Sequence, residues 1–268
     1  MEKHKSIYPD EVPNQRENSR REFIFKAATG LLLATGAVTI PFQHKHKEGS
    51  IKAVAFDAFA IFDPRPVFAL TERLFPGKGK ELAETWRLKQ FEYIWLREAA
   101  GQYKNFLDTT KDALLFAARK AQISLSETDK TTLVNAYLSL EVWPDVLPTL
   151  DFLRKKGIRL GFLSNMTEKM LNSCIIHNRL NEYFEVVLST DQFKTYKPSP
   201  RSYQMGVDGF HLKESEILFV AFAGWDAVGS KWFGYPTYWA NRLDAPAEEL
   251  NISIDMTGKT LEGIRNLV

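Results

Sequence analysis

The chain has 268 residues, 44% of them hydrophobic and 25% charged, which is ordinary for a globular protein with one α/β core and an inserted subdomain. Of its 35 basic and 33 acidic residues, eight and six lie in residues 1–49, so residues 50–268 hold 27 of each and carry no net charge. This balance excludes the basic surface of a nucleic-acid-binding protein. The single cysteine, Cys174, excludes an internal disulfide and a thiolate metal cluster.

Residues 1–50 have the pattern of an export signal and linker rather than of a folded element. Arg20 and Arg21 precede an uncharged run at residues 27–40, which is too short to span a bilayer comfortably. The paired arginines followed by Phe23 resemble the twin-arginine signal, which implies export to the periplasm by the twin-arginine machinery. The alternative is an N-terminal tail without a signal. Because the cleavage site is poorly marked, a loose membrane anchor is also left open.

The first expected strand covers residues 51–56, a mostly apolar run rich in β-branched and aromatic side chains. Asp57 follows it directly, at the strand end where open α/β sheets bind ligands. A carboxylate in this place is a nucleophile, a metal ligand or a cap for the next loop. Residues 58–63 are expected to form that loop, and Pro64 and Pro66 end the local structure.

Residues 67–140 show helical periodicity throughout, with no strand-like alternation. The apolar positions predict one helix around residues 82–96, a second around 113–117 and a third around 133–140. We therefore expect a helical cap at residues 64–144.

Strands and helices alternate after Pro144. The expected order is helix 147–155, strand 158–163, helix 168–178, strand 184–188, a helix opening at 196–200, strand 217–223 and a last clear strand at 237–240. This alternation predicts a parallel sheet covered on both faces. The predicted fold is thus α/β, with a Rossmann-like parallel sheet core formed by residues 51–63 and 145–268 and an inserted helical cap.

Polar residues stand at several of these strand or loop ends: Asp57, Ser164, Asn165, Lys197 and Asp226. The carboxyl ends of parallel strands lie on one edge of a sheet, so these side chains can converge on one pocket. A lysine beside a carboxylate lowers the pKa of that carboxylate and keeps it ionised.

Five stretches carry a resemblance to a known family: Ala55–Phe59, Trp86–Arg97, Leu163–Asn165, Tyr196–Pro198 and Trp225–Ala227. They resemble the haloacid dehalogenase superfamily, and more closely its (S)-2-haloacid dehalogenases, and the resemblance covers nearly all of residues 51–268. It implies hydrolysis of a small 2-haloacid without metal or cofactor. An aspartate displaces halide from C2, and water then hydrolyses the aspartyl ester.

The resemblance also implies roles for individual residues. The expected catalytic residues are Asp57 as nucleophile, Arg87 as halide acceptor, Lys197 as partner of Asp57 and Asp226 as the group that positions Lys197 and the water. The expected substrate-binding residues are Ser164 and Asn165 for the carboxylate and Phe59, Phe106 and Trp225 as pocket walls. The alternative for Arg87 is a solvated charge on a helix surface.

Three positions depart from the family pattern: Ile61 stands where a threonine is expected, and Ala221 and Ala223 replace a serine and an asparagine. These losses favour the alternative of a non-catalytic or degenerate exported relative that binds small acids. A magnesium-dependent phosphatase is less favoured, because Phe59 occupies the position of its second carboxylate. A homodimer is left open.

Overall fold

The computed structural model describes residues 51–268, so the predicted export signal lies outside the described residues. Its centre is a sheet of six strands in the order β3-β2-β1-β4-β5-β6, and every neighbouring pair is parallel. The strands are β1 (Ala53–Phe56), β2 (Arg159–Ser164), β3 (Val186–Ser189), β4 (Ile217–Ala221), β5 (Thr237–Ala240) and β6 (Met256–Gly258). The predicted α/β fold with a parallel sheet is confirmed.

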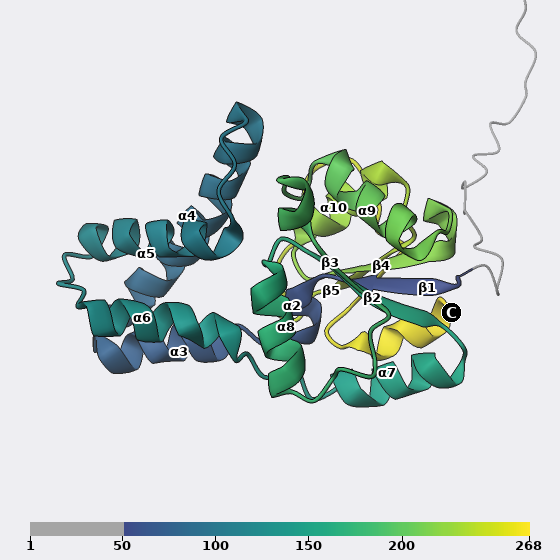
Figure 1. Cartoon of the computed structure of the whole chain (residues 1–268), viewed down its shortest axis with the longest axis horizontal. Coiled ribbons are helices and arrows are strands. Elements are labelled where there is room, and N and C mark those ends of the chain that lie inside the picture. Colours follow the sequence, from purple (N-terminus) through teal and green to yellow (C-terminus); the bar gives the residue numbers. More distant parts are fainter. Residues whose placement is uncertain (1–50) are drawn as a thin grey trace, which may run out of the picture. The chain divides into compact units, whose positions relative to one another are not determined.

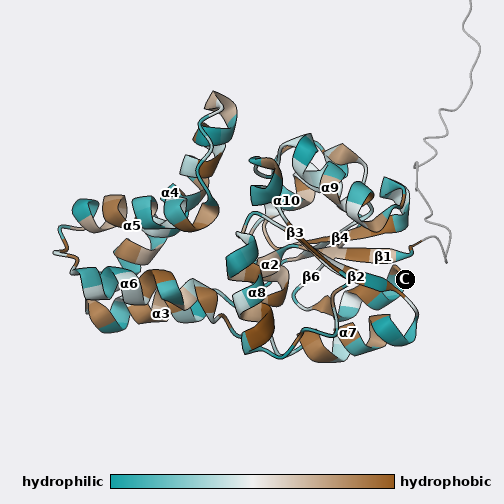
Figure 2. Ribbon diagram, in the orientation of Figure 1, coloured by the Kyte–Doolittle hydropathy of each residue, from teal (hydrophilic) through white to brown (hydrophobic). Residues whose placement is uncertain are grey.

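Helices cover both faces of the sheet (Figure 1). One face carries α9 (Pro200–Phe210) and α10 (Gly224–Phe233); the other carries α7 (Val146–Lys155), α8 (Glu168–His177) and the C-terminal 3-10 helix η4 (Leu261–Asn266). All five residues of β4 are buried, because its side chains alternate between these two layers. The strands accordingly form the hydrophobic centre of the molecule in Figure 2.

Between β1 and β2 the chain forms a helical insert, residues 65–138. It consists of α3 (Arg65–Leu74), α4 (Gly79–Ala100), α5 (Phe106–Lys120), α6 (Glu127–Asn135) and the 3-10 turn η1 (Ala136–Leu138). Asn105 and Ser126 cap α5 and α6 by accepting hydrogen bonds from backbone N–H groups in the first turn. Gly101, with φ of +63°, ends α4 in the left-handed conformation. The boundaries 64 and 144 of a separate cap stay a prediction.

The structure corrects several predicted elements. The expected loop at residues 58–63 begins with a one-turn helix, α2 (Ala58–Ile61), because Asp57 caps its N-terminus. The third predicted helix ends at Asn135 and continues as η1. The strand expected at 217–223 ends at Ala221, and β6 was missed because three residues are too short for a periodic pattern.

The strand order reverses direction between β1 and β4, which are neighbours in the sheet although far apart in the sequence. Such a switch point leaves a crevice at the carboxyl ends of the two strands, where open α/β sheets bind ligands. None of the helices within residues 51–268 has the length and apolar character needed to cross a membrane.

Candidate active site

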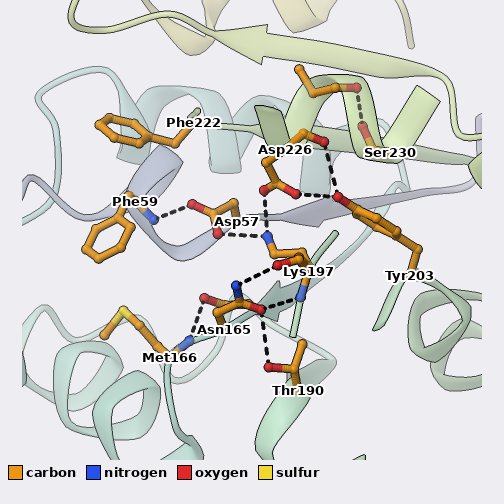
Figure 3. Close-up of polar contacts among 12 residues, drawn as sticks. Asp57, Phe59, Asn165, Met166, Thr190, Lys197, Tyr203, Phe222, Asp226 and Ser230 are labelled. Carbon is orange, nitrogen blue, oxygen red and sulfur yellow. Dashed lines mark hydrogen bonds and ion pairs between the residues drawn. The ribbon is translucent and has the colours of Figure 1, made fainter. Parts of the chain in front are cut away.

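Asp57 lies at the switch point, immediately after β1, with only 8% of its surface exposed. Its Oδ2 accepts a hydrogen bond of 3.0 Å from the backbone N–H of Phe59, and its Oδ1 lies 2.9 Å from Nζ of Lys197 (Figure 3). The carboxylate therefore both caps α2 and forms an ion pair with Lys197. Both oxygens are held, so the orientation of the group is fixed.

Lys197 is fully buried and lies between two carboxylates. Its Nζ is 2.9 Å from Asp57 Oδ1 and 2.6 Å from Asp226 Oδ2. Burial alone would lower the pKa of this amine, but the charges of Asp226 and Asp57 outweigh burial and raise it, so Lys197 stays an ammonium. Its backbone N–H donates a 2.8 Å hydrogen bond to Asn165 Oδ1, which fixes the main chain as well.

Asp226 lies in the first turn of α10 and is 2% exposed. Burial, together with the charge of Asp57, raises the pKa of Asp226 to about 6, while Lys197 opposes the shift. The hydroxyl of Tyr203 donates a 2.8 Å hydrogen bond to Asp226 Oδ1. Because burial and the carboxylate of Asp226 raise the pKa of Tyr203 well above its usual value, this hydroxyl remains a donor.

Arg87 projects from α4 into a cage of three aromatic rings. Its Cζ lies 5.1 Å from the ring centroid of Phe59, 4.6 Å from that of Phe91 and 5.7 Å from that of Phe222. Among the described residues, its buried Nη1 has no hydrogen-bond acceptor, and burial lowers the pKa of the guanidinium. The interpretation of Arg87 as a solvated surface charge is therefore wrong.

Asp57, Asp226 and Arg87 with its aromatic rings line a common cavity. Its polar lining comes from Asp57, Arg87, Ser164, Asn165 and Asp226, and its apolar lining from Phe59, Phe91, Phe106, Met166, Phe222, Ala223 and Trp225. A cavity with an apolar wall and a few convergent charged groups is typical of a small-molecule site.

Ser164 and Asn165, predicted to hold a substrate carboxylate, are both at the cavity but already have intramolecular partners. Ser164 Oγ accepts a 3.1 Å hydrogen bond from the backbone N–H of Met166. Asn165 Oδ1 accepts from the backbone N–H of Lys197 and, at 3.3 Å, from the Thr190 hydroxyl. Within residues 51–268 its Nδ2 makes only a long contact, 3.4 Å, with the carbonyl of Lys197. The amide nitrogen of Asn165 is thus the more available group for a ligand.

The family model for haloacid dehalogenase-like hydrolases matches residues 44–234. The chain belongs to this family. It is 36% identical to an (S)-2-haloacid dehalogenase of Pseudomonas sp. (strain YL), covering 81% of this chain and 94% of the relative. It is 35% identical to haloacetate dehalogenase H-2 of Moraxella sp. (strain B), covering 81% of this chain and 98% of that protein.

Solved structures of haloacid dehalogenases share the fold. An L-2-haloacid dehalogenase that is 37% identical superposes with a TM-score of 0.80, covering 81% of this chain and 98% of the other. The L-2-haloacid dehalogenase of Xanthobacter autotrophicus with chloropropionic acid covalently bound is 29% identical, with a TM-score of 0.75, and the match covers 81% of this chain and 98% of that one.

In this haloacid dehalogenase-like hydrolase, eight of the nine predicted site residues line the cavity: Asp57, Phe59, Arg87, Phe106, Ser164, Asn165, Trp225 and Asp226. The ninth, Lys197, lies behind the two carboxylates. The structure brings them together, and the role of each stays a prediction.

Sequence reasoning missed Tyr203, Phe91 and Phe222. Phe91 could have been found, because it lies one turn beyond Arg87 on the same face of α4. Phe222 directly follows β4, so its position at a strand end could have indicated the cavity. Tyr203 gave no local signal, since it reaches the site only through the packing of α9.

The donor atoms at the cavity do not suit a divalent cation. Magnesium takes several oxygen ligands in a near-octahedral arrangement. Here the carboxylates of Asp57 and Asp226 share the ammonium of Lys197, and Phe59 supplies no oxygen. No group of three or more His, Cys, Asp or Glu side chains in residues 51–268 is placed to hold a metal ion.

Proposed function

We propose that the chain hydrolyses (S)-2-haloacids to 2-hydroxy acids through an ester on Asp57, without metal. The observation that carries the proposal is the arrangement of Arg87 and Asp57 around one cavity. A nucleophilic carboxylate faces the same small space as a buried guanidinium nitrogen that has no acceptor within residues 51–268. Displacement of a halide needs these two groups: one to attack carbon and one to receive the anion that leaves.

In the first half-reaction a carboxylate oxygen of Asp57 attacks C2, the carbon–halogen bond breaks, and the halide carries away the bonding electrons. Attack from the side opposite the halogen inverts C2, so an (S)-2-haloacid gives an (R)-2-hydroxy acid. Three aromatic rings surround the guanidinium and its Nη1 is buried, so a halide at this nitrogen is partly shielded from water, which strengthens the interaction.

In the second half-reaction water attacks the ester carbonyl of Asp57. The acyl C–O bond breaks, the hydroxy acid leaves, and the carboxylate is regenerated with release of a proton. Of the lining residues that the structure describes, Asp226 is the only other carboxylate, and its pKa of about 6 leaves it ionised at neutral pH. It is therefore suited to hold the water and accept its proton.

The relatives support this proposal, since those at 35–36% identity over 81% of the chain are named as an (S)-2-haloacid dehalogenase and a haloacetate dehalogenase. The departures at Ile61, Ala221 and Ala223 keep the non-catalytic acid-binding protein as the alternative. We also infer that residues 1–50 direct export through the twin-arginine machinery.

The test is release of chloride from (S)- and (R)-2-chloropropionate by the full chain. Chloride from the (S) enantiomer alone, lost in Asp57→Asn and unchanged by a chelator, is the expected result. If no haloacid releases halide while the wild type still binds small carboxylates, the chain is the binding protein instead.

A further inference from the structure

One face of α4 extends from the cavity, where Arg87 and Phe91 lie, to a segment of the α/β core. Arg87, Phe91, Trp95 and Glu98 are spaced by four, four and three residues, so they form a stripe on one side of the helix, the α4 stripe. Phe91 and Trp95 both pack on Trp225, with ring centroids 5.5 and 5.4 Å away. At a rise of ~1.5 Å per residue, Glu98 lies roughly 16 Å along the helix from Arg87.

Glu98 bonds a segment of the α/β core rather than its own helix. Its Oε1 accepts a 2.8 Å hydrogen bond from Thr195 Oγ1, and its Oε2 accepts a 2.9 Å hydrogen bond from the backbone N–H of Tyr196. Thr195 and Tyr196 are fully buried, and the next residue in the chain is Lys197. One carboxylate thus holds two consecutive residues directly before the lysine of the site.

The same segment, residues 191–196, is held by the turn that follows α4. The Tyr196 hydroxyl donates a 2.5 Å hydrogen bond to the carbonyl of Lys104. The Tyr103 hydroxyl donates a 2.7 Å hydrogen bond to Asp191 Oδ1, and its ring stacks on Tyr196 with centroids 5.2 Å apart. We call residues 191–196 the Lys197 loop.

We propose that Glu98 is a positioning residue that couples two catalytic groups on different parts of the chain. Its contact with Thr195 and Tyr196 holds α4, which carries Arg87, against the α/β core. The same contact fixes the Lys197 loop, which directly precedes Lys197. When the contact is made, Arg87 closes the cavity while Lys197 is held between Asp57 and Asp226. The proposal rests on the dehalogenase function above only for its kinetic consequences.

The chemistry of the contact requires a carboxylate. A carboxylate is acceptor-only and can receive both the Thr195 hydroxyl and the Tyr196 N–H, and charged acceptors make the stronger hydrogen bonds. In Glu98→Gln the side chain keeps one acceptor oxygen and turns an NH₂ group toward the other donor. In Glu98→Ala the buried N–H of Tyr196 loses its partner.

Glu92 provides a matched control on the same helix. It is 41% exposed and pairs with Lys89 at 2.7 Å, one turn away within α4. Glu92→Gln removes the same charge from α4 without touching the Lys197 loop.

The first measurement is steady-state halide release from (S)-2-chloropropionate. We expect Glu98→Ala to lower kcat about 10- to 100-fold, as for a catalytic group displaced by a fraction of an ångström, and to change KM by less than about threefold. Glu98→Gln and Thr195→Val, which each keep one of the two hydrogen bonds, should fall between Glu98→Ala and the wild type. Glu92→Gln should match the wild type.

The second measurement does not depend on catalysis. Lys197 is fully buried, so its acylation by acetic anhydride, followed by mass spectrometry, reports how often the site opens. We expect Glu98→Ala to be acylated at Lys197 about tenfold faster than the wild type, the change that follows from losing hydrogen bonds to a charged group. Glu92→Gln should show the wild-type rate.

The outcomes separate the two proposals. Absence of halide release from the wild type would overturn the dehalogenase function and leave the acylation test in force. If Lys197 is acylated at the wild-type rate in both Glu98→Ala and Glu98→Gln, the role of Glu98 is overturned. This holds even if thermal unfolding shows the two variants to be less stable.

Discussion

At the residue scale, the site is governed by two carboxylates that share one ammonium. Asp57 and Asp226 both contact Lys197, so the three groups together carry one negative charge. Asp226 is the more deeply buried carboxylate. Burial and then the charge of Asp57 raise the pKa of Asp226 to about 6. Its protonation therefore falls in an accessible pH range, which yields predictions for both activity and stability.

Halide release should decline below about pH 6, roughly tenfold per pH unit. The reason is that protonated Asp226 no longer accepts a proton from water and holds Lys197 less firmly. A pH–rate profile with (S)-2-chloropropionate measures this. A rate that stays constant down to pH values near 4 would show that Asp226 does not have to be ionised.

Protonation of Asp226 has the opposite effect on stability: it should raise the free energy of unfolding, although it lowers activity. The folded-state pKa of Asp226 lies above its ordinary value of 3.8, so its contribution to the free energy of unfolding is fully present below that value and is lost as pH rises through about 6. We expect wild type to lose more stability than Asp226→Asn between about pH 4 and about pH 7 in urea unfolding. Equal losses would contradict the raised pKa.

Hydrolysis of the ester should be slower than its formation. Ala223 lines the cavity, and Ala221 of β4 is buried on the face of the sheet that α9 and its Tyr203 cover. Neither methyl side chain can form a hydrogen bond to a water or to Asp226. Losing one positioned hydrogen bond at such a site typically costs about 10²–10³ in rate. Mass spectrometry of wild type incubated with (S)-2-chloropropionate should therefore show an adduct on the Asp57 peptide.

The double variant Ala221→Ser with Ala223→Asn tests whether the two alanines make ester hydrolysis slow. It should raise turnover and deplete the adduct, because both side chains restore hydrogen bonding near the water. If the wild type turns over without an adduct and the double variant is no faster, the two alanines do not limit the reaction.

At the scale of secondary-structure elements, the contact between α9 and α10 sets the position of Asp226. Tyr203 of α9 reaches the Asp226 carboxylate because Gly229 of α10 leaves room for its hydroxyl. A Cβ added at Gly229 would lie 2.5 Å from Tyr203 Oη and 2.9 Å from Pro198 Cβ, and Pro198 follows Lys197 directly. The glycine is required by close packing between these elements, not by its backbone angles.

Gly229→Ala should lower the free energy of unfolding by about 1–3 kcal/mol, the usual cost of overpacking, and should slow ester hydrolysis. Gly224→Ala is the control on the same helix, since a Cβ there meets only the flexible side chain of Glu248. Urea unfolding and halide release measure both effects. Equal results for the two variants would show that the α9–α10 contact does not control the site.

At the scale of the whole molecule, the chain has two parts, the α/β hydrolase at residues 51–268 and the predicted export signal and linker at residues 1–50. The part that the structure describes, residues 51–268, contains the sheet, its helices and the site. Residues 1–50 lie outside that part, and their arginine pair before an uncharged run stays the basis of the export prediction.

Export should depend on Arg20 and Arg21. Replacing both with lysine keeps the positive charge but removes the arginine pair that the twin-arginine machinery recognises. We expect the variant to accumulate in the cytoplasm, as measured by cell fractionation, while Lys3 and Lys5 changed to arginine should leave export unchanged. Recovery of the double lysine variant from the periplasm at the wild-type level would contradict a twin-arginine signal.

The sequence by itself determined the parallel α/β sheet and the gathering of polar strand ends at one edge. Both follow from local patterns: apolar runs of strand length, helical periodicity, and the rule that parallel strands end on the same side. Asp57, Ser164 and Asp226 could be placed at the site because Ser164 ends a strand and the other two follow strands closely in the chain.

Only the tertiary structure decided how these groups are held. The hydrogen bond of Tyr203 to Asp226, the aromatic cage of Arg87 and the contact of Glu98 with residues 195–196 join segments that are distant in the chain or lie on separate elements. The short strand β6 and the turn of helix after Asp57 also escaped prediction. Such features depend on which surfaces meet after packing, and a local pattern of apolar and polar residues carries no record of its distant partners.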